Sequence, residues 1–281
     1  MKIIKYDPNR TPVLVGIGTA AQREDDLHLA KSPMQLMTTA VKAAHADVGS
    51  DQLLQGTQWI GVPKGRWHFS NPAGQIAKDI GADHAHCVLS SVGVLQQSLI
   101  AQACQLIAQG EAHTTLVTGA DAGYRLMLAK RSGQKLSDPI DQGQPHEFWQ
   151  PQEDLRHPVE VLAGLKMPVG LYALLESAFR KSRGWTMAEH QDRLAKMVEQ
   201  FSEIALDNPE AWHRRKVHAS EVHQPHPRNA YLAFPYNRHH CASWSVDQAA
   251  ALVFCSAARA IELGIPQDQW IFPLVSSESN H

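Results

Sequence analysis

The feature that most constrains this chain is an uncharged segment between Asp83 and Glu111, which contains no Asp, Glu, Lys or Arg. After a turn at Ser90 to Gly93, its apolar residues form a broad arc on a helical wheel, and Gly110 ends the pattern. A helix with so few polar positions needs apolar neighbours on several sides. We therefore expect a helix that is buried on most sides, with its N-terminus at Ser90 to Gly93.

Strand patterns flank this predicted helix. Residues 86–89 precede it and residues 114–118 follow it, both with mostly apolar or β-branched side chains. Strand, turn, helix and strand in this order predict a βαβ crossover, whose two strands are parallel. Chemistry is expected at the helix N-terminus, because its unpaired amides and the helix dipole favour a developing negative charge.

The same alternation extends back to the start of the chain. A continuous apolar run at residues 12–18 predicts a buried strand, followed by a helix at 33–46, a strand at 58–62 and a second helix at 72–80. The first part of the chain is therefore predicted to be β-α-β-α-β-α-β. This order places the protein in the α/β class, with a layered sheet.

After residue 122 the alternation stops. Two helices are predicted at 169–183 and 187–207, and a buried strand at 249–256 then returns the chain to the sheet. The predicted organisation has a first part at 1–122, an inserted loop domain at 123–230, a returning strand and helix at 231–265, and a tail at 266–281 with a strand candidate at 270–275.

Composition narrows the classes of function. The 281 residues carry a net charge of −2 and are 43% hydrophobic, which gives no electrostatic argument for nucleic acid or a membrane surface as partner. No apolar run is long enough to span a bilayer, and the N-terminal residues lack the apolar core of a signal peptide. Four cysteines without a short paired spacing predict free thiols in a reducing compartment, so we expect a cytoplasmic protein.

Two motifs have both a functional and a structural interpretation. Residues 16–21 match the dinucleotide-binding pattern G-x-G-x-x-A, but that pattern needs a helix directly after the glycines and a second strand where the sequence predicts a helix. Four histidines crowd the polar stretch between 213 and 226. Without an H-E-x-x-H motif or a cysteine pair they favour a solvated loop, and no metal site is expected.

Several segments together resemble the thiolase superfamily, specifically its sterol-carrier-protein-2-thiolase-like branch, often labelled acetyl-CoA acetyltransferase. In chain order they are TPVLVGIGTAAQR, NPAGQIAKDIGA, the turn that starts at Ser91 with QSLIAQACQLIAQGEAHTTLVTGADA, EQFSEIALDNPEAW and PYNRHHCASWSVDQAAALVFCSAARAIELGI. The motif from Asp247 to Leu252 is the most telling. The resemblance is to the family's N-terminal half, a βαβαβαβ sheet with a helical loop domain inserted before the fifth strand.

The resemblance implies acyl transfer between thioesters of coenzyme A, with a Cys nucleophile at the N-terminus of the third helix. If Gly93 matches the Gly of the family's C-x-S-G turn, Ser90 holds the nucleophile position, and its hydroxyl needs an adjacent base. Cys87 is the alternative nucleophile, although it lies inside the predicted strand, where a side chain packs. The structural alternative for Ser90 and Ser91 is a pair of helix N-caps.

The family's second half supplies a His that activates the nucleophile and a Cys or His that handles the second substrate. Those motifs have no counterpart after Phe272. His239 and His240 lie beside Cys241, just before the returning strand, and His240 is our candidate catalytic histidine. The structural alternative for this pair is a solvated turn.

Binding of coenzyme A implies cations that meet its phosphates. Basic residues gather in the two helices of the inserted region, where Arg180, Lys181 and Arg183 are the candidate coenzyme A ligands, with Arg193 and Lys196 nearby. The structural alternative is the solvated face of an amphipathic helix.

Two functions follow from the resemblance. The leading hypothesis is a thiolase-like, acyl-CoA-handling protein of fatty-acid or sterol-type metabolism, incomplete or partner-dependent as a catalyst, with a coenzyme A thioester as substrate and no permanently bound cofactor. The alternative is a non-catalytic scaffold subunit that docks on a complementary thiolase-like chain. Both predict a homo-oligomer, or a hetero-oligomer with a thiolase-like C-terminal half. The acyl chain, the direction of reaction and catalytic competence stay open.

Overall fold

The computed structural model describes residues 7–138, 143–154 and 156–278. The chain forms two compact units: unit 1 comprises residues 1–153 and 245–281, and unit 2 comprises residues 154–244. Residues 123–153, predicted as part of the inserted loop domain, lie in the sheet-containing unit 1, and residues 231–244, predicted with the returning strand, lie in unit 2.

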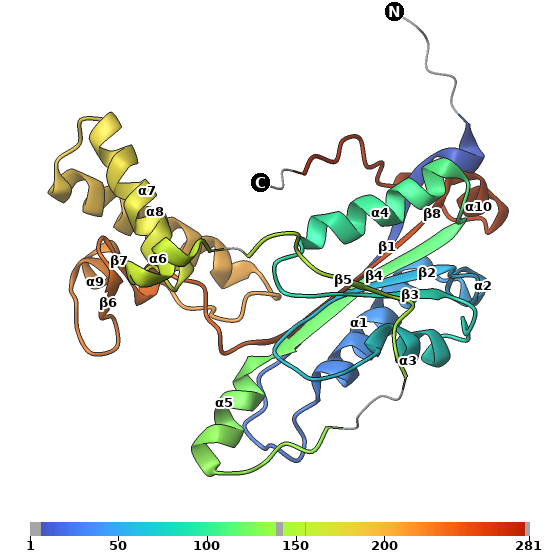
Figure 1. Ribbon diagram of the computed structural model, residues 1–281, viewed down its shortest axis with the longest axis horizontal. Helices are drawn as coiled ribbons and strands as arrows, with labels where there is room; N and C mark the ends of the chain where they lie inside the picture. The colour runs from blue at the N-terminus through green and yellow to red at the C-terminus, as the bar shows by residue number, and fades with distance from the viewer. Residues whose placement is uncertain (1–6, 139–142, 155, 279–281) are drawn as a thin grey trace, which may run out of the picture. The chain divides into compact units, whose positions relative to one another are not determined.

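Unit 1 is built on a six-stranded sheet with the order β1-β8-β4-β2-β3-β5 (Figure 1). The strands are β1 (Pro12–Gln22), β2 (Trp59–Pro63), β3 (His86–Ser90), β4 (Thr114–Ala122), β5 (Glu147–Trp149) and β8 (Asp247–Ser256). Strands β2, β3, β4 and β5 are parallel, whereas β8 runs antiparallel to both of its neighbours, β1 and β4. The predicted α/β class and the placing of the first four strands in one sheet are confirmed.

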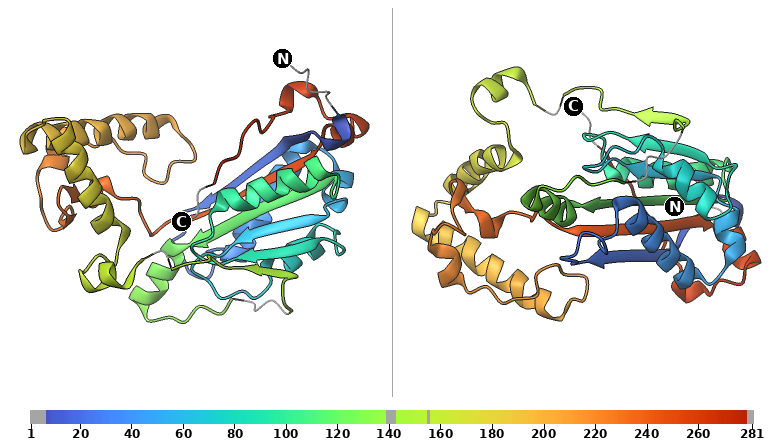
Figure 2. Two further views of the ribbon diagram at one scale, coloured as in Figure 1. Left: turned by 45° about the horizontal axis from the view of Figure 1, so that its top comes forward. Right: turned by 90° about the horizontal axis from the view of Figure 1, so that it is seen from below.

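Helices cover the two faces of this sheet unequally (Figures 1 and 2). Helices α1 (Pro33–Val48) and α3 (Pro72–Asp79), with the short α2 (Asp51–Gln55), pack on one face. Helix α4 (Gln96–Gln109) packs on the other. Helices α5 (Gly123–Ser132) and α10 (Ala257–Glu262) follow β4 and β8 directly.

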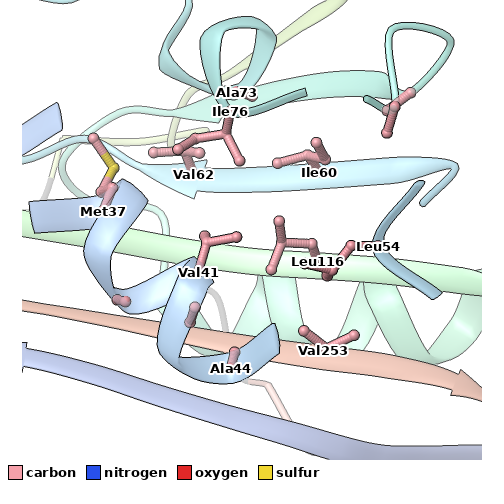
Figure 3. Packing of buried hydrophobic residues seen from close by; sticks show 14 of the residues in the cluster. Met37, Val41, Ala44, Leu54, Ile60, Val62, Ala73, Ile76, Leu116 and Val253 are labelled. Atoms are coloured by element: carbon pink, nitrogen blue, oxygen red, sulfur yellow. The ribbon is translucent and has the colours of Figure 1, made fainter. Parts of the chain in front are cut away.

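The larger hydrophobic core lies between the sheet and α1 and α3. Figure 3 shows side chains of this core, among them residues of α1, α2, α3, β2, β4 and β8; labelled members are Met37, Val41, Ala44, Leu54, Ile60, Val62, Ala73, Ile76, Leu116 and Val253. Ile60, Ile76 and Leu116 are completely inaccessible to solvent. Burial of these apolar side chains contributes favourably to the free energy of folding.

The glycines of the dinucleotide-like pattern lie inside β1, and no helix follows them directly. A Cβ on Gly18 would lie 2.0 Å from the carbonyl oxygen of Ala40, and one on Gly16 would lie 2.4 Å from Cγ2 of Val48. The missing side chains thus let α1 lie directly on β1. The nucleotide interpretation is wrong, because the pattern serves helix–strand packing.

Helix α4 departs from the sequence prediction at its start and in its burial. Strand β3 extends through Ser90, a turn follows at Ser91 to Val94 with Gly93 at φ 110°, and the helix begins only at Gln96 after Leu95. The predicted N-terminus at Ser90 to Gly93 and the N-cap role of both serines are therefore wrong. The φ of Gly93 requires glycine, since other residues are strained there.

The burial of α4 is confined to one stripe. Leu99, Ala103 and Ile107, spaced four residues apart, are buried against the sheet, while the outer positions are half-buried or exposed. The expectation of burial on most sides is wrong, because all positions of α4 outside this stripe are half-buried or exposed. The apolar arc of α4 is therefore wider than the stripe that the sheet buries.

Three further elements of unit 1 differ from the prediction. The segment at 270–275 is not a strand, because only Ile271 pairs, through an isolated bridge with Leu14. Helix α5 and strand β5 were not predicted, because the stretch that contains them is polar and irregular as a whole, and β5 has only three residues. Strand β5 nevertheless extends the sheet beyond β3.

Unit 2 is mainly helical. It contains α6 (Pro158–Leu162), α7 (Pro168–Ser182), α8 (Met187–Asp207), α9 (Ala219–His223), a hairpin of β6 (Tyr231–Ala233) and β7 (Tyr236–Asn237), and the single turn η2 (Arg238–His240). The predicted helices at 169–183 and 187–207 are confirmed as α7 and α8. Across the residues that the structure describes, no helix combines the length and apolar character needed to cross a membrane.

Candidate functional site

The carboxyl ends of four parallel strands meet at one edge of the unit 1 sheet, which is where open α/β sheets bind ligands. Ser90 is the last residue of β3 and lies between Pro63 of β2 and Trp149 of β5. Its carbonyl accepts a hydrogen bond from the Lys64 N–H at 2.8 Å, and the Ser91 N–H donates to the Trp149 carbonyl at 2.8 Å. The backbone of the candidate nucleophile is thus fixed by both neighbouring strands.

The side chain of Ser90 is fully buried, with 0% of its surface exposed, and its Oγ has no hydrogen-bond partner among the described residues. Because side chains alternate along a strand, Ser90 lies on the same face as Val88, which packs with Leu99 of α4. The hydroxyl therefore lies in the layer between β3 and α4. It contacts no activating base within the described part of unit 1.

Cys87 lies three positions earlier in β3 and faces the opposite layer, in the core with α1 and α3. Its Sγ donates to the Ala85 carbonyl at 3.3 Å, and its backbone N–H donates to Nδ1 of His146 at 2.9 Å. Burial raises the pKa of the Cys87 thiol to about 11. The thiolate that a nucleophilic cysteine needs is therefore disfavoured at neutral pH.

His240 belongs to unit 2, at the end of η2. Its Nδ1 accepts the backbone N–H of Asn237 at 3.1 Å, which leaves the proton of the neutral ring on Nε2. Burial, reinforced by His239, lowers the pKa of His240. Ser90 and Cys87 lie in unit 1, on opposite faces of β3. A catalytic pair of His240 with either residue stays a prediction.

The three predicted coenzyme A ligands lie at the end of α7. Arg180 Nη1 donates to the Trp185 carbonyl at 2.7 Å, and the Arg183 guanidinium lies over the rings of Phe179 and Trp185, at 5.4 and 5.7 Å. Lys181 is exposed between them. The structure brings Arg180 and Arg183 together around Trp185. A role of the three cations in binding coenzyme A stays a prediction.

A buried polar network beside β8 was not recognised as a feature of its own in the sequence. The carboxylate of Asp247 is inaccessible to solvent and accepts the backbone N–H groups of Tyr124 at 2.8 Å and Arg125 at 3.1 Å, at the start of α5. The Arg125 guanidinium pairs with Asp138 at 2.8 Å. Burial raises the pKa of Asp247 despite these hydrogen bonds. Asp247 thus anchors α5 to the start of β8, and the only sequence signal was its place in the D-Q-A-A-A-L motif.

Unit 2 contains an apolar groove of about 740 Å³, lined by residues of α7, α8, the β6–β7 hairpin and the segment 239–244. One wall holds a polar cluster in which the Tyr236 hydroxyl donates to Glu176, while Nε2 of the buried His190 lies 3.0 Å from the other Glu176 oxygen. Helical periodicity predicted α7 and α8 but not this groove, because its walls come from segments far apart in the sequence.

Metal chemistry has no candidate position in the described part of the chain, where no group of three or more His, Cys, Asp or Glu side chains is arranged to hold a metal ion. Two of the four histidines between 213 and 226 instead make separate contacts with carboxylates. His218 pairs with Glu199 at 3.2 Å, and His223 pairs with Asp192 at 3.7 Å.

Neither a protein-family model nor a curated protein matches the sequence. Among solved structures, a monomeric SCP2-thiolase-like protein type 1 from Mycobacterium smegmatis matches with a TM-score of 0.73 and 27% sequence identity, over 95% of this chain and 50% of that chain. The chain has a thiolase-like fold. The thiolase-like resemblance noted in the sequence is thereby confirmed, and it concerns half of such a protein.

Two further solved structures show the same fold. The Ltp2–ChsH2(DUF35) aldolase matches with a TM-score of 0.62 and 19% identity, over 92% of this chain and 58% of that chain. The dimeric peroxisomal thiolase of Saccharomyces cerevisiae matches with a TM-score of 0.56 and 14% identity, over 93% and 68%. The thiolase-like chain described here thus spans between half and about two thirds of the structures it matches.

Proposed function

We propose that this chain provides the first half of a thiolase-like, acyl-CoA-handling protein of the acetyl-CoA acyltransferase type. Its work would be completed by a second thiolase-like half, on the same polypeptide or on a partner chain. The observation that supports this most directly is the match to the SCP2-thiolase-like protein over 95% of this chain but 50% of that one. Free thiols at all four cysteines fit a reducing, cytoplasmic setting.

The surface beside α4 supports the need for a second half. Val92 and Leu95, in the turn before α4, are 71% and 44% exposed, and Ile17 of β1 is 43% exposed. Ile100 and Cys104 of α4 are only partly buried. Apolar side chains grouped on one face of a soluble protein mark an interaction surface. The occupant that the thiolase-like fold suggests is a second half of the same kind, in a homo-oligomer or a hetero-oligomer.

In the catalytic version of this proposal, Ser90 Oγ attacks the thioester carbonyl, the C–S bond breaks, and the coenzyme A thiolate leaves with the acyl group retained on the serine. The hydroxyl proton must pass to a base. That base would come from the second half or from His240, while Arg180, Lys181 and Arg183 would meet the coenzyme A phosphates. The Ser90 side chain must also become accessible, since it is fully buried in this chain.

A non-catalytic scaffold is the second candidate, and two observations favour it. Ser90 Oγ has neither solvent access nor a described partner, and the thiol of Cys87 has its pKa raised to about 11 by burial. A protein that only docks on a complementary thiolase-like chain needs neither group to react. The two candidates share the fold and the α4 surface and differ only in whether an acyl group is transferred.

Intact-protein mass spectrometry after incubation with acetyl-CoA separates the two candidates. The chain is incubated alone and with a second thiolase-like half, and acylated peptides are mapped. An adduct on Ser90 that is lost in Ser90→Ala, or one on Cys87 that is lost in Cys87→Ala, supports catalysis. Titration of acetyl-CoA into wild type and into the charge-reversed Arg180→Glu variant tests coenzyme A binding. Absence of both adduct and binding, with the second half present, contradicts the acyl-CoA proposal and leaves the scaffold.

A further inference from the structure

A polar pocket of about 370 Å³ lies in unit 1, at the amino ends of the parallel strands. Gln58, His84 and His113 line it, and they come shortly before β2, β3 and β4. In Figure 1, α10 and α2 mark this end of the sheet and α5 marks the opposite end. Because β3 has five residues, roughly 15 Å separates the pocket from Ser90 at the other edge of the sheet. The pocket is therefore not part of the candidate site described above.

The lining of this pocket is rich in N–H donors. Five of its ten lining residues carry an N–H group on the side chain: Asn9, Gln58, His84, His113 and Arg259. Glu262 is the one carboxylate of this lining, and its side chain is 66% exposed. Ala258 is the one aliphatic side chain. Such a lining favours a polar anion over an apolar ligand.

Several of these donors are unused within the described part of the chain. The rings of His84 and His113 are exposed and make no hydrogen bond or ion pair with another described residue. Gln58 uses only its amide oxygen, which accepts the His113 N–H at 2.6 Å. A neutral imidazole keeps one N–H donor. A ligand in the pocket can thus reach three side chains that have free donors.

Arg259 of α10 provides the fixed positive charge of the pocket. Its side chain is 23% exposed, with Nη1 2.8 Å from a Glu262 oxygen and Nη2 donating to the Gln52 carbonyl at 3.4 Å. These two contacts hold the guanidinium in place and use only two of its five N–H donors. A side chain that is already held in position loses less conformational entropy when a ligand binds.

We propose that this pocket binds a small phosphate monoester of a polar alcohol, with Arg259, His84 and His113 donating to the phosphate. A phosphate monoester has up to two negative charges and three terminal oxygens, so it can accept more of these donors than a carboxylate can. The pocket volume is at the low end of the range for small-molecule sites, roughly 300 to 1,000 Å³, which suits a ligand of few atoms. The site lies within unit 1 and needs no acyl-CoA, so it stands apart from the function proposed above.

Glycerol 3-phosphate is the probe, titrated into the full chain by isothermal calorimetry at fixed ionic strength. Glycerol tests the need for the anion, acetate tests a carboxylate, and inorganic phosphate tests the need for the alcohol. We expect saturable binding of glycerol 3-phosphate, weaker binding of inorganic phosphate, and no binding of glycerol or acetate. Absence of saturable glycerol 3-phosphate binding up to about 10 mM, or equal binding of acetate, overturns the proposal. Equal binding of inorganic phosphate overturns the choice of an ester.

Two sets of variants locate the site. Arg259→Gln removes the fixed charge and is expected to weaken binding at least about tenfold. Arg131→Gln, at an exposed position of α5, is the matched control and leaves binding unchanged. His84→Ala and His113→Ala combined should weaken binding about tenfold, whereas the exposed His28→Ala leaves it unchanged. Unchanged binding in both pocket variants overturns the position of the site.

Glu262→Gln is the sharpest test, because a gain in affinity cannot come from a damaged fold. This change removes a like charge from beside the anion and frees Nη1 of Arg259, so binding should tighten about threefold to tenfold. Weaker binding in Glu262→Gln overturns the proposal. Urea titration without ligand establishes that each variant keeps its fold. Binding that is lost in Arg180→Glu and kept in Arg259→Gln would place the anion on unit 2, which also overturns the proposal.

Discussion

On one face of the unit 1 sheet, α1 and α3 close a continuous core in which Ile60, Ile76 and Leu116 have no contact with solvent. On the other face, α4 covers a smaller cluster along a single stripe and leaves Ile17, Val92 and Leu95 exposed. The same sheet thus has one face that is fully packed by helices of this chain and one face that is only partly covered. The comparison teaches that the first face is closed by helices of this chain, whereas the second face keeps apolar side chains exposed.

The largest expected loss of stability comes from a substitution in the fully packed face. Gly18→Leu forces a side chain into the Ala40 carbonyl, which a Cβ would approach to 2.0 Å, so α1 must leave the sheet. We expect a loss of at least about 3 kcal/mol in the free energy of unfolding, measured by urea titration. Thr19→Val, at the exposed neighbouring position of β1, should stay within about 0.5 kcal/mol of wild type. Equal stabilities of the two variants would contradict close α1–β1 packing.

A pair of truncations compares the two faces at equal chemistry. Ile76→Ala, in the closed core, should lower the free energy of unfolding by about 2 to 5 kcal/mol, because it leaves a cavity that cannot collapse. Ile100→Ala, on the half-buried flank of α4, should cost less than about 1 kcal/mol, since less area is buried and alanine favours the helix. The two denaturation midpoints provide the measurement. A larger loss at Ile100 than at Ile76 would reverse the comparison.

The thiols of the two faces titrate with a predictable sign. Burial raises the pKa of Cys87, in the closed core, and of Cys104, in α4, from 9.0 to about 11. A thiol whose pKa is raised in the folded state stabilises the fold below pH 9, and this stabilisation is lost as pH rises towards 11. The free energy of unfolding should therefore fall between pH 9 and 11.

Single alanine variants check that titration. Cys87→Ala and Cys104→Ala should each reduce the fall in stability across this pH interval, measured by urea titrations at successive pH values. Cys104→Ala also shows whether the smaller cluster under α4 excludes water as well as the larger core does. A pH profile that neither variant changes would mean that both thiols are solvated.

The smallest effect on stability, and the largest on association, is expected on the open face. Changing Val92 and Leu95 together to Ser should alter the free energy of unfolding by less than about 0.5 kcal/mol, because both side chains are already exposed. The wild-type chain should self-associate or bind a second thiolase-like half through this surface, and the double variant should do so less. Sedimentation velocity of both proteins, mixed and alone, measures this. Identical sedimentation would exclude the α4 face as an interface.

The sequence predicted the elements whose pattern is strong and local. The β-α alternation up to β4, the two long helices α7 and α8, and the returning strand β8 all follow from periodicity and from Gly and cap residues. It could not predict β5, which has three residues and forms only because β3 offers an edge. It overestimated the burial of α4, because an apolar arc reports what a helix can bury and not whether this chain supplies the partner.

The surroundings of the candidate site residues differ from those that the sequence predicts. The sequence predicts Ser90 in the turn at the helix N-terminus, whereas the structure has it as the last residue of β3, on the side of α4. The complete burial of Ser90 and the opposite orientation of Cys87 depend on where β3 ends and where α4 begins. The helix begins at Gln96, six residues after the predicted start at Ser90. The groove around His240 had no sequence signal, since contacts across unit 2 create it.

The central claim is that this chain packs one face of the sheet fully and covers the other only in part. Hydrogen exchange of the isolated chain tests this claim most directly. Backbone amides of α1 and α4 are compared by mass spectrometry at equal temperature and pH. The account predicts that α1 amides exchange about tenfold more slowly than those of α4, because a helix buried on one stripe opens more easily. Equal or greater protection of α4 in the isolated chain would contradict it.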